Sequence, residues 1–167
     1  MSRNRLWVVA ALAVVGLLIF VFFWFQPQKL LIEDTVSEAP PRVVPTADET
    51  RPETTLTLAR GEFRSLEHDT HGTATTLEIP DGRRYLRLEG LDTSNGPDLR
   101  VYLSEIPASD DWYAYGERFV DLGSLKGNRG DQNYALPEGL DLSRFKSAVI
   151  WCRRFTVGFG VAPLERV

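Results

Sequence analysis

The chain has 167 residues, a formal net charge of −4 and a single cysteine. One cysteine cannot form an internal disulfide, so any folded region must be stabilised by an ordinary hydrophobic core. The sequence contains no basic stripe, which argues against nucleic acid or an anionic membrane surface as a partner.

Residues 6–25 form an uninterrupted apolar segment, LWVVAALAVVGLLIFVFFWF. A helix of this length spans about 30 Å, the thickness of the hydrocarbon core of a bilayer. Arg3 and Arg5 precede the segment, and basic residues at that position tend to stay in the cytoplasm. The sequence therefore predicts a cytoplasmic N-terminus (1–5), a single-pass transmembrane anchor (6–25) and an extracytoplasmic remainder, either periplasmic or at the cell surface.

A cleavable signal peptide is the alternative interpretation of the same segment. The apolar region of a signal peptide is usually about 7–15 residues long and is followed by small residues at the cleavage site. Here Trp24, Phe25, Gln26 and Pro27 end the segment. We therefore favour a retained signal anchor, with the membrane as a partner.

Residues 26–52 are rich in proline and lack a sustained apolar period. Such a segment is semi-extended, so we expect it to act as a tether between the anchor and a folded domain.

From residue 53 onward, short runs alternate apolar with polar residues, as in Leu99–Leu103. Proline and glycine turns such as Pro80-Asp81-Gly82 separate these runs, and no long amphipathic helix is indicated beyond one turn capped by Asp141. We expect residues 53–167 to form one all-β domain, an antiparallel β-sandwich or a barrel-like variant of it. Near the end, alternation places Phe155, Val157, Phe159 and Val161 on one face.

Cys152 lies in the run Val149–Phe155, where alternation places it on one face with Ile150 and Arg154. Free cysteine is often buried as a small hydrophobic residue, so a purely structural role is one interpretation. The other is a functional thiol, because Arg153 and Arg154 follow directly and positive charge favours a thiolate. An unused thiol outside the cytoplasm is also a liability unless it is sheltered.

His68 and His71 are the only histidines, and with Cys152 they could form a copper site of the His₂Cys kind. The alternative is that both imidazoles are solvated in a polar loop. The sequence has no C-x-x-C-H motif for covalent haem and no C-x-x-C motif for thiol exchange or zinc.

The run Asp110–Tyr115 combines two acids with Trp112, Tyr113 and Tyr115. Exposed aromatic rings beside carboxylates could bind a ligand such as a glycan. A loop folded over the end of the sandwich explains the same residues.

Several motifs are shared with a known family: Gly96-Pro97-Asp98-Leu99, Val101-Tyr102-Leu103, Lys126-Gly127-Asn128, Gly130-Asp131-Gln132, Tyr134 and Val149-Ile150-Trp151-Cys152. Through these motifs, residues 61–164 resemble the DM-thirteen domain, a module described as an electron-transfer domain. The family occurs alone in bacterial membrane-anchored proteins and beside DOMON domains in animals.

The resemblance implies a redox role for Cys152, either as a bare thiol or as the thiolate ligand of a prosthetic group such as haem. We expect Trp151 and Arg154 to neighbour any such group, with Arg154 tuning it, and a redox partner protein to exchange electrons with it. The expected function is thus electron transfer or redox sensing rather than turnover of a substrate. The alternative is a non-catalytic ligand-, glycan- or protein-binding or adhesion module in which Cys152 is only structural.

Overall fold

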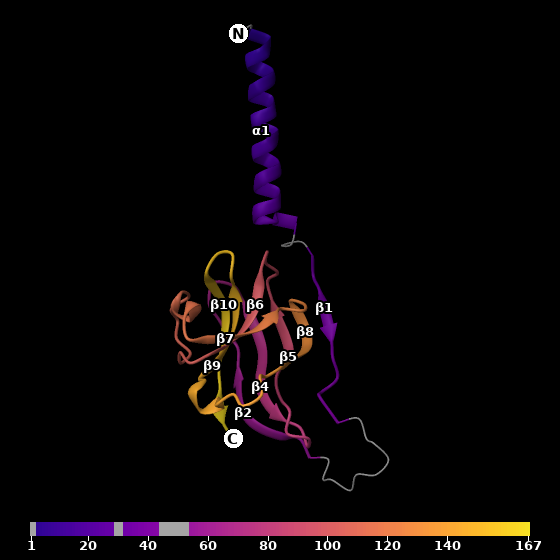
Figure 1. Ribbon diagram of the computed structural model, residues 1–167, viewed down its shortest axis with the longest axis vertical. Coiled ribbons are helices and arrows are strands. Elements are labelled where there is room, and N and C mark those ends of the chain that lie inside the picture. The colour runs from indigo at the N-terminus through magenta and orange to yellow at the C-terminus, as the bar shows by residue number, and fades with distance from the viewer. Residues whose placement is uncertain (1–2, 29–31, 44–53) are drawn as a thin grey trace.

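The structure is a computed structural model that describes residues 3–28, 32–43 and 54–167. It begins with helix α1 (Arg3–Phe25), which is long and apolar enough to cross a membrane. Figure 1 shows this helix standing clear of the β-strands, and the side chains of residues 4–25 are exposed. The helix covers the predicted transmembrane segment.

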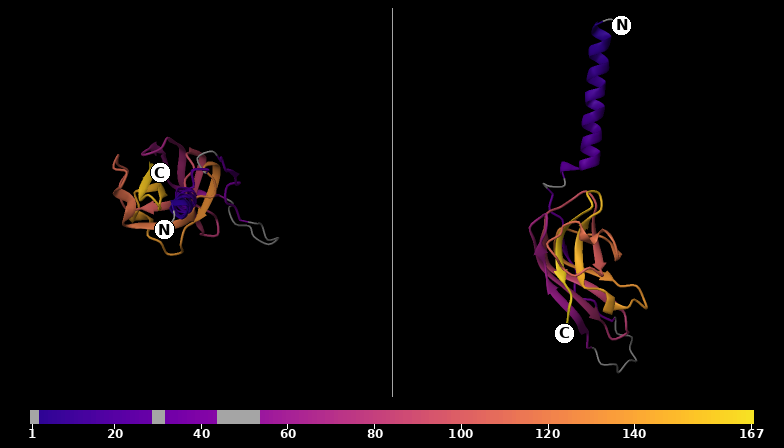
Figure 2. Two further views of the ribbon diagram at one scale, coloured as in Figure 1. Left: turned by 90° about the horizontal axis from the view of Figure 1, so that it is seen from above. Right: turned by 90° about the vertical axis from the view of Figure 1, so that its left-hand side faces the viewer.

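The rest of the described chain forms two β-sheets packed face to face, which confirms the predicted all-β fold (Figures 1 and 2). Sheet A has the strand order β1-β8-β5-β4-β2-β11, and sheet B has the order β3-β10-β9-β6-β7. The strands are β1 (Thr35–Ser37), β2 (Leu56–Glu62), β3 (Arg64–Ser65), β4 (Thr70–Glu78), β5 (Arg84–Thr93), β6 (Leu99–Ser104), β7 (Phe119–Ser124), β8 (Arg129–Ala135), β9 (Ser147–Cys152), β10 (Val157–Pro163) and β11 (Glu165–Arg166). Two short 3₁₀ helices, η2 (Ala114–Gly116) and η3 (Leu142–Arg144), complete the fold, and Asp141 caps η3 as predicted.

The main core lies between the sheets, where alternate residues of each strand meet. Leu86 and Leu88 of β5 pack there with Val101 and Leu103 of β6 and with Ile150 of β9. A second cluster lies on the other side of sheet B and contains Tyr102, Tyr115, Val149, Trp151 and Val161. Sheet B is therefore covered on both faces, and every residue of β9 is buried.

The predicted face of residues 155–161 is wrong at both ends. Phe155 lies in the turn before β10 and is exposed. The register of β10 against β9 shifts between Gly158 and Gly160, and such a bulge changes the face to which later residues point. Val157 and Phe159 therefore face the main core, whereas Val161 joins the second cluster.

The segment predicted as a tether contains strand β1, which pairs in parallel with β8 at the edge of sheet A. Val36 lies opposite Gly130, where a Cβ atom would come within 2.0 Å of the Val36 carbonyl oxygen. The absence of a side chain at Gly130 thus permits the close approach. Residues 32–43 consequently run along the domain instead of forming a free tether, while residues 29–31 and 44–52 of the prediction lie outside the described residues.

Candidate functional site

Cys152 is the last residue of β9 and lies between Leu99 of β6 and Val157 of β10. Its side chain is completely buried in the main core, on the same face as Ile150, as the alternation predicted. The turn that follows, residues 153–156, is at the end of the sandwich nearest α1 (Figure 1). Cys152 is therefore a sheltered thiol one residue from the surface.

The surroundings of the sulfur act on the pKa of the Cys152 thiol in two opposite directions. Burial raises the pKa of the Cys152 thiol above its ordinary value, whereas hydrogen bonding from the backbone N–H groups of Phe155, Arg154 and Asp98 acts in the opposite direction. The thiol is thus protonated at neutral pH. The same N–H groups would stabilise an anionic form of the sulfur, and hydrogen bonds to sulfur are one means by which proteins set redox potentials.

Asp98 holds the turn in place, a role that the sequence did not reveal. Its carbonyl oxygen accepts a hydrogen bond of 3.0 Å from the Arg153 backbone N–H, and its Oδ2 accepts one of 2.8 Å from Arg153 Nε. The turn also requires a left-handed backbone at Thr156, where φ is +53°. The family motif at Gly96-Pro97-Asp98 was the available signal, but it did not name Arg153 as the partner.

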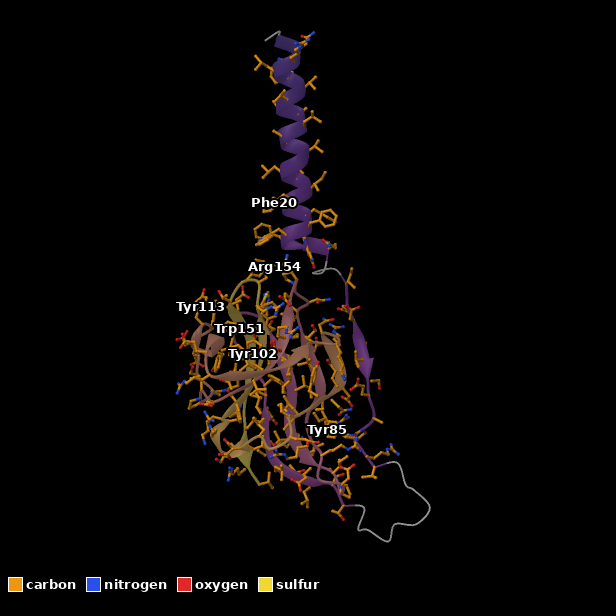
Figure 3. The ribbon with its side chains drawn as sticks, in the orientation of Figure 1. Phe20, Tyr85, Tyr102, Tyr113, Trp151 and Arg154 are labelled. Atoms are coloured by element: carbon orange, nitrogen blue, oxygen red, sulfur yellow. The ribbon has the colours of Figure 1, made fainter. Side chains whose placement is uncertain are left out.

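Two predicted neighbours of a cofactor at Cys152 lie elsewhere. Arg154 does not share the face of the cysteine, because β9 ends at Cys152 and Arg154 belongs to the turn. Figure 3 shows Arg154 beneath the end of α1, and its guanidinium lies 5.2 Å from the centre of the Trp24 ring. Trp151 points to the second cluster, where it stacks with Tyr102 at 6.0 Å between ring centres.

The histidines do not assemble with Cys152. The His68 ring packs on Phe159 with 4.0 Å between ring centres and pairs with Glu67 at 2.9 Å. His71 is an exposed residue of β4, opposite Asp92 of β5. In the described ranges, no three His, Cys, Asp or Glu side chains come together in a way that could hold a metal ion.

A haem group does not fit at Cys152 either. The cysteine is completely buried, and it lines neither of two pockets found among the described residues. A haem or copper ligand at this position would require the strands around the sulfur to separate. The geometry thus favours a bare thiol over a ligand of a prosthetic group.

Most of the shared motif residues between 126 and 134 form a structural network. The buried Gln132 accepts hydrogen bonds from the backbone N–H groups of Lys126 and Gly127 and donates one of 2.6 Å to the Gly127 carbonyl oxygen. Tyr134 donates a hydrogen bond of 2.8 Å from its hydroxyl to Gln132 Oε1. Asn128 then accepts a hydrogen bond from the backbone N–H of Asp34. The network shapes the edge of sheet A on which β1 lies.

Tyr134 should make the folded protein less stable as the pH becomes alkaline. Burial raises the pKa of Tyr134 to about 12 from an ordinary value of about 10. Between these values the folded protein keeps a proton that the unfolded chain has lost, so stability is full below pH 10 and falls as the pH rises towards 12. We expect a loss of about 2–3 kcal/mol from this group, at about 1.4 kcal/mol per pKa unit.

Urea unfolding at pH 8, 10 and 11.5 measures this loss. Tyr134→Phe should start from a lower stability at pH 8 but should lose less on going to pH 11.5. Some slope should remain, because burial also raises the pKa of Cys152 and of Tyr102. Equal slopes for the variant and the parent chain would show that Tyr134 does not carry the effect.

The run Asp110–Tyr115 folds over the outer face of sheet B, with one aromatic residue inside and two outside. Tyr115 is completely buried, and its hydroxyl bonds to the backbone N–H and carbonyl oxygen of Ser109. Trp112 and Tyr113 remain exposed. The Trp112 carbonyl oxygen accepts a hydrogen bond of 2.7 Å from Gly158, so this loop is fixed beside the turn that follows Cys152.

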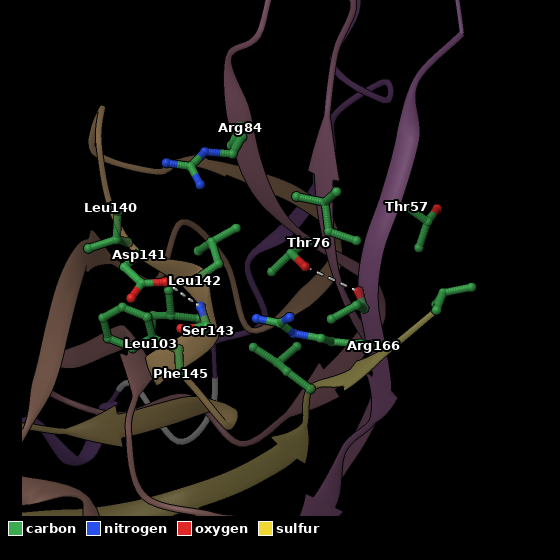
Figure 4. Close-up of a pocket in the computed structure, with 14 residues that line it drawn as sticks. Thr57, Thr76, Arg84, Leu103, Leu140, Asp141, Leu142, Ser143, Phe145 and Arg166 are labelled. Carbon is green, nitrogen blue, oxygen red and sulfur yellow. Dashed lines mark hydrogen bonds between the residues drawn. The ribbon is translucent and has the colours of Figure 1, made fainter.

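The larger of the two pockets lies at the opposite end of the sandwich from Cys152, with a cavity volume of about 450 Å³ (Figure 4). Leu103, Leu140 and Phe145 contribute apolar side chains to its lining. Figure 4 shows the guanidinium groups of Arg84 and Arg166 directed into the same space. The second pocket is smaller, about 140 Å³, and lies between the 94–99 and 124–128 loops.

Comparison with known proteins gives one family. A sequence profile described as electron transfer DM13 matches residues 62–164, which cover the sandwich from the end of β2 to the start of β11. Neither a curated protein nor a solved structure matches the chain. The profile covers well over half of the sequence and includes Asp98, Cys152 and the 126–134 network. The chain therefore belongs to the DM13 family of electron-transfer domains, the family that its motifs resemble.

Proposed function

We propose that the protein is a membrane-anchored, extracytoplasmic redox domain in which Cys152 is the reactive group. Membership of an electron-transfer family supports a redox role. The observation that carries the proposal is the position of the only cysteine, which is completely buried at the end of β9, next to a surface turn, where the backbone N–H groups of Asp98, Arg154 and Phe155 partly offset the effect of burial on its pKa. Helix α1 is the anchor, and Arg5 with Arg3 keeps the N-terminus in the cytoplasm.

The bare thiol suits redox sensing better than continuous electron flow, because it is protonated and sheltered at rest. When the 153–156 turn opens, the thiol loses its proton and the sulfur attacks one oxygen of a peroxide. An S–O bond forms as the O–O bond breaks, and two electrons pass from sulfur to the leaving oxygen. With hydrogen peroxide, the leaving oxygen takes up the proton and departs as water, and Cys152 becomes a sulfenic acid. Two external thiols return it to the thiol, with formation of a disulfide and water.

Oxidation of the full chain in lipid nanodiscs tests this proposal. Hydrogen peroxide should add one oxygen to Cys152, which dithiothreitol removes and dimedone traps, and Cys152→Ser should show no such product. Met1 is the only methionine, so the main competing oxidation is easily assigned by peptide mapping. A structural cysteine would instead react no faster than the whole domain unfolds, as measured by hydrogen exchange in the same sample.

The ion pair between Asp98 and Arg153 should control the rate of oxidation of Cys152. Asp98→Asn removes an ion pair whose contribution is about 1 kcal/mol, so opening of the turn should become about five- to tenfold more frequent. The carboxylate of Asp98 also raises the pKa of Cys152, so the pH profile of the reaction should shift to lower pH in the variant.

Asp121→Asn is the matched control for this variant. Asp121 pairs with Arg100 in the same sheet and is exposed to a similar degree, but unlike Asp98 it forms no ion pair with Arg153. Its oxidation rate should equal that of the parent chain. Equal acceleration by both substitutions would mean that general destabilisation, rather than release of the turn, exposes the sulfur.

A second proposed function, ligand binding, rests on the pocket at the other end of the sandwich. The pocket joins apolar side chains to the guanidinium groups of Arg84 and Arg166 and to the carboxylate of Asp141, so its charged side chains carry a net positive charge. Within the part of the chain that the structure describes, neither arginine forms an ion pair, in contrast to the neighbouring Arg83, which pairs with Asp81. This combination fits a small amphipathic anion with a carboxylate and a hydrocarbon body.

Calorimetric titration of the full chain with decanoate tests the second function. Arg84→Gln and Arg166→Gln should each weaken binding by about tenfold, as expected for loss of one charge-assisted hydrogen bond. Arg83→Gln, which alters the neighbouring side chain outside the pocket lining, should leave binding unchanged. Absence of measurable binding, or equal binding by all three variants, would remove this proposal and leave the redox proposal untouched.

A further inference from the structure

We infer that the end of the sandwich that shelters Cys152 is held against the headgroup layer of the membrane that α1 crosses. The surface concerned consists of Trp112, Tyr113, Arg154 and Phe155, and we call it the membrane-facing end. The inference rests on the proposed anchoring by α1. Four observations carry it: the length of the connection, the firmness of its attachment, the contacts with α1 and the chemistry of the exposed side chains.

The connection between α1 and the domain is short. Helix α1 ends at Phe25, and at Ile32 the chain is already attached to the domain, because the Ile32 carbonyl oxygen accepts a hydrogen bond from Asn95. Only residues 26–31 lie between these points. Even a fully extended chain of this length spans at most about 25 Å. The domain therefore stays close to the bilayer.

The attachment of the segment after residue 31 is firm. The Glu38 carboxylate binds Lys126 Nζ at 2.7 Å and accepts a hydrogen bond of 2.7 Å from the Asn133 backbone N–H. Glu33 pairs with Arg129 at 2.7 Å, and the ladder between β1 and β8 lies between these two contacts. Within the predicted tether, only residues 26–31 therefore lie between α1 and the attached segment.

The attachment also decides which end of the domain faces the bilayer. Asn95, in the loop before β6, contacts both Ile32 and Asp34, so the chain from α1 arrives at this end of the sandwich. The 153–156 turn lies at the same end, because Leu99 pairs with Cys152. Figure 1 and the right-hand view of Figure 2 both show α1 above this end.

Side chains of the turn contact the last turn of α1 directly. The Phe155 ring stacks on Phe25 with 6.0 Å between ring centres. Arg154 lies over the Trp24 ring and donates a hydrogen bond to the Trp24 carbonyl oxygen. These contacts place the turn at the depth where the apolar helix ends, which is the boundary between hydrocarbon and headgroups.

The exposed side chains at this end suit a membrane interface. Trp112, Tyr113 and Phe155 are 42%, 67% and 41% exposed, and Trp and Tyr prefer the headgroup region because one part of each ring is apolar and another is polar. Arg154 can extend its guanidinium to lipid phosphates. Asp110 and Asp111 precede Trp112, so the surface is not strongly positive and contact does not require anionic lipid. A zwitterionic bilayer is the partner that this chemistry fits.

This placement adds a location to the redox proposal, because the 153–156 turn that covers Cys152 lies in the headgroup layer. An oxidant or reductant of Cys152 reaches it at the membrane surface. Movement of the turn away from the lipid would then accompany exposure of the sulfur.

Fluorine NMR of the full chain tests the inference. The protein, labelled with 5-fluorotryptophan, is placed in phosphatidylcholine nanodiscs with and without a lipid that carries a gadolinium chelate on its headgroup. Trp24 reports on α1 and Trp112 on the membrane-facing end, and both signals should broaden with the paramagnetic lipid. Gly130→Ala, which removes the attachment of β1, should abolish most of the broadening at Trp112 and leave that at Trp24.

Phe155→Ser should also reduce the broadening at Trp112, whereas Leu56→Ser should not, since Leu56 is an exposed leucine at the opposite end of the sandwich. Broadening at Trp24 without broadening at Trp112 would overturn the inference while the anchor stands. Absence of broadening at both Trp7 and Trp24 would show that α1 is not in the bilayer. In that case the proposed anchoring fails, and the membrane-facing end fails with it.

Discussion

Replacing Gly130 with alanine should detach β1 from sheet A and lower the free energy of unfolding by about 2–4 kcal/mol. The added Cβ would lie 2.0 Å from the Val36 carbonyl oxygen, and φ at this position is +94°. The substitution therefore combines a collision with backbone strain. Urea unfolding measures the loss of stability. Hydrogen exchange at Glu38, whose N–H bonds to the Asp131 carbonyl oxygen at 2.9 Å, reports directly on β1.

Gly82→Ala separates the two causes. Gly82 has a similar backbone angle, φ +86°, but no atom lies within 4 Å of the position that a Cβ would take. Its substitution should cost only the strain, about 1 kcal/mol, and leave exchange at Glu38 unchanged. If Gly130→Ala costs no more than Gly82→Ala and Glu38 stays protected, β1 does not depend on the close approach at Gly130.

The sequence predicted the sandwich well because its signal is local. Alternation within β6 and β9 assigned Val101, Leu103 and Ile150 to the main core and Trp151 to the opposite face, as the structure shows. The same rule failed in β10, because a bulge changes the face to which the later residues point. The pattern of apolar residues in the sequence does not show where such a bulge lies. It also missed β1, a three-residue strand held mainly by backbone and polar contacts to residues far along the chain.

The site was predictable only in part. Burial of Cys152 followed from its alternation with Ile150, but the pattern could not show that the strand ends at the cysteine, and Arg154 was therefore misplaced. The contact between Asp98 and Arg153 joins residues 55 positions apart and is not encoded in the neighbourhood of either. The polar groups near the sulfur are backbone N–H groups, which any residue supplies. Such a site has no side-chain motif beyond the cysteine itself.

Arg87→Leu should lower the free energy of unfolding by about 2–4 kcal/mol, although Arg87 belongs to sheet A and Cys152 to sheet B. Arg87 is 4% exposed and binds Glu89 and Asp131, each at 2.9 Å. Removing one member of a buried ion pair costs about 3–5 kcal/mol, but both acids here reach solvent, which reduces the expected loss. Arg100→Leu is the control, because Arg100 also binds a carboxylate and a hydroxyl from a strand but is more exposed, so about 1 kcal/mol is expected.

Arg87 also contacts the segment that contains β1, so its substitution should affect the attachment that holds the domain near the membrane. Arg87 Nη1 donates a hydrogen bond of 3.0 Å to the Glu38 carbonyl oxygen, at the end of the attached segment. If β1 and Arg87 form one unit, Arg87→Leu and Gly130→Ala should cost less together than the sum of their separate costs, by more than about 0.5 kcal/mol. Arg87→Leu alone should then also weaken the broadening of Trp112 by headgroup-labelled lipid. Strict additivity would instead mean that the attachment of β1 is independent of Arg87 and rests on the ladder with β8 and on the pairs made by Glu33 and Glu38.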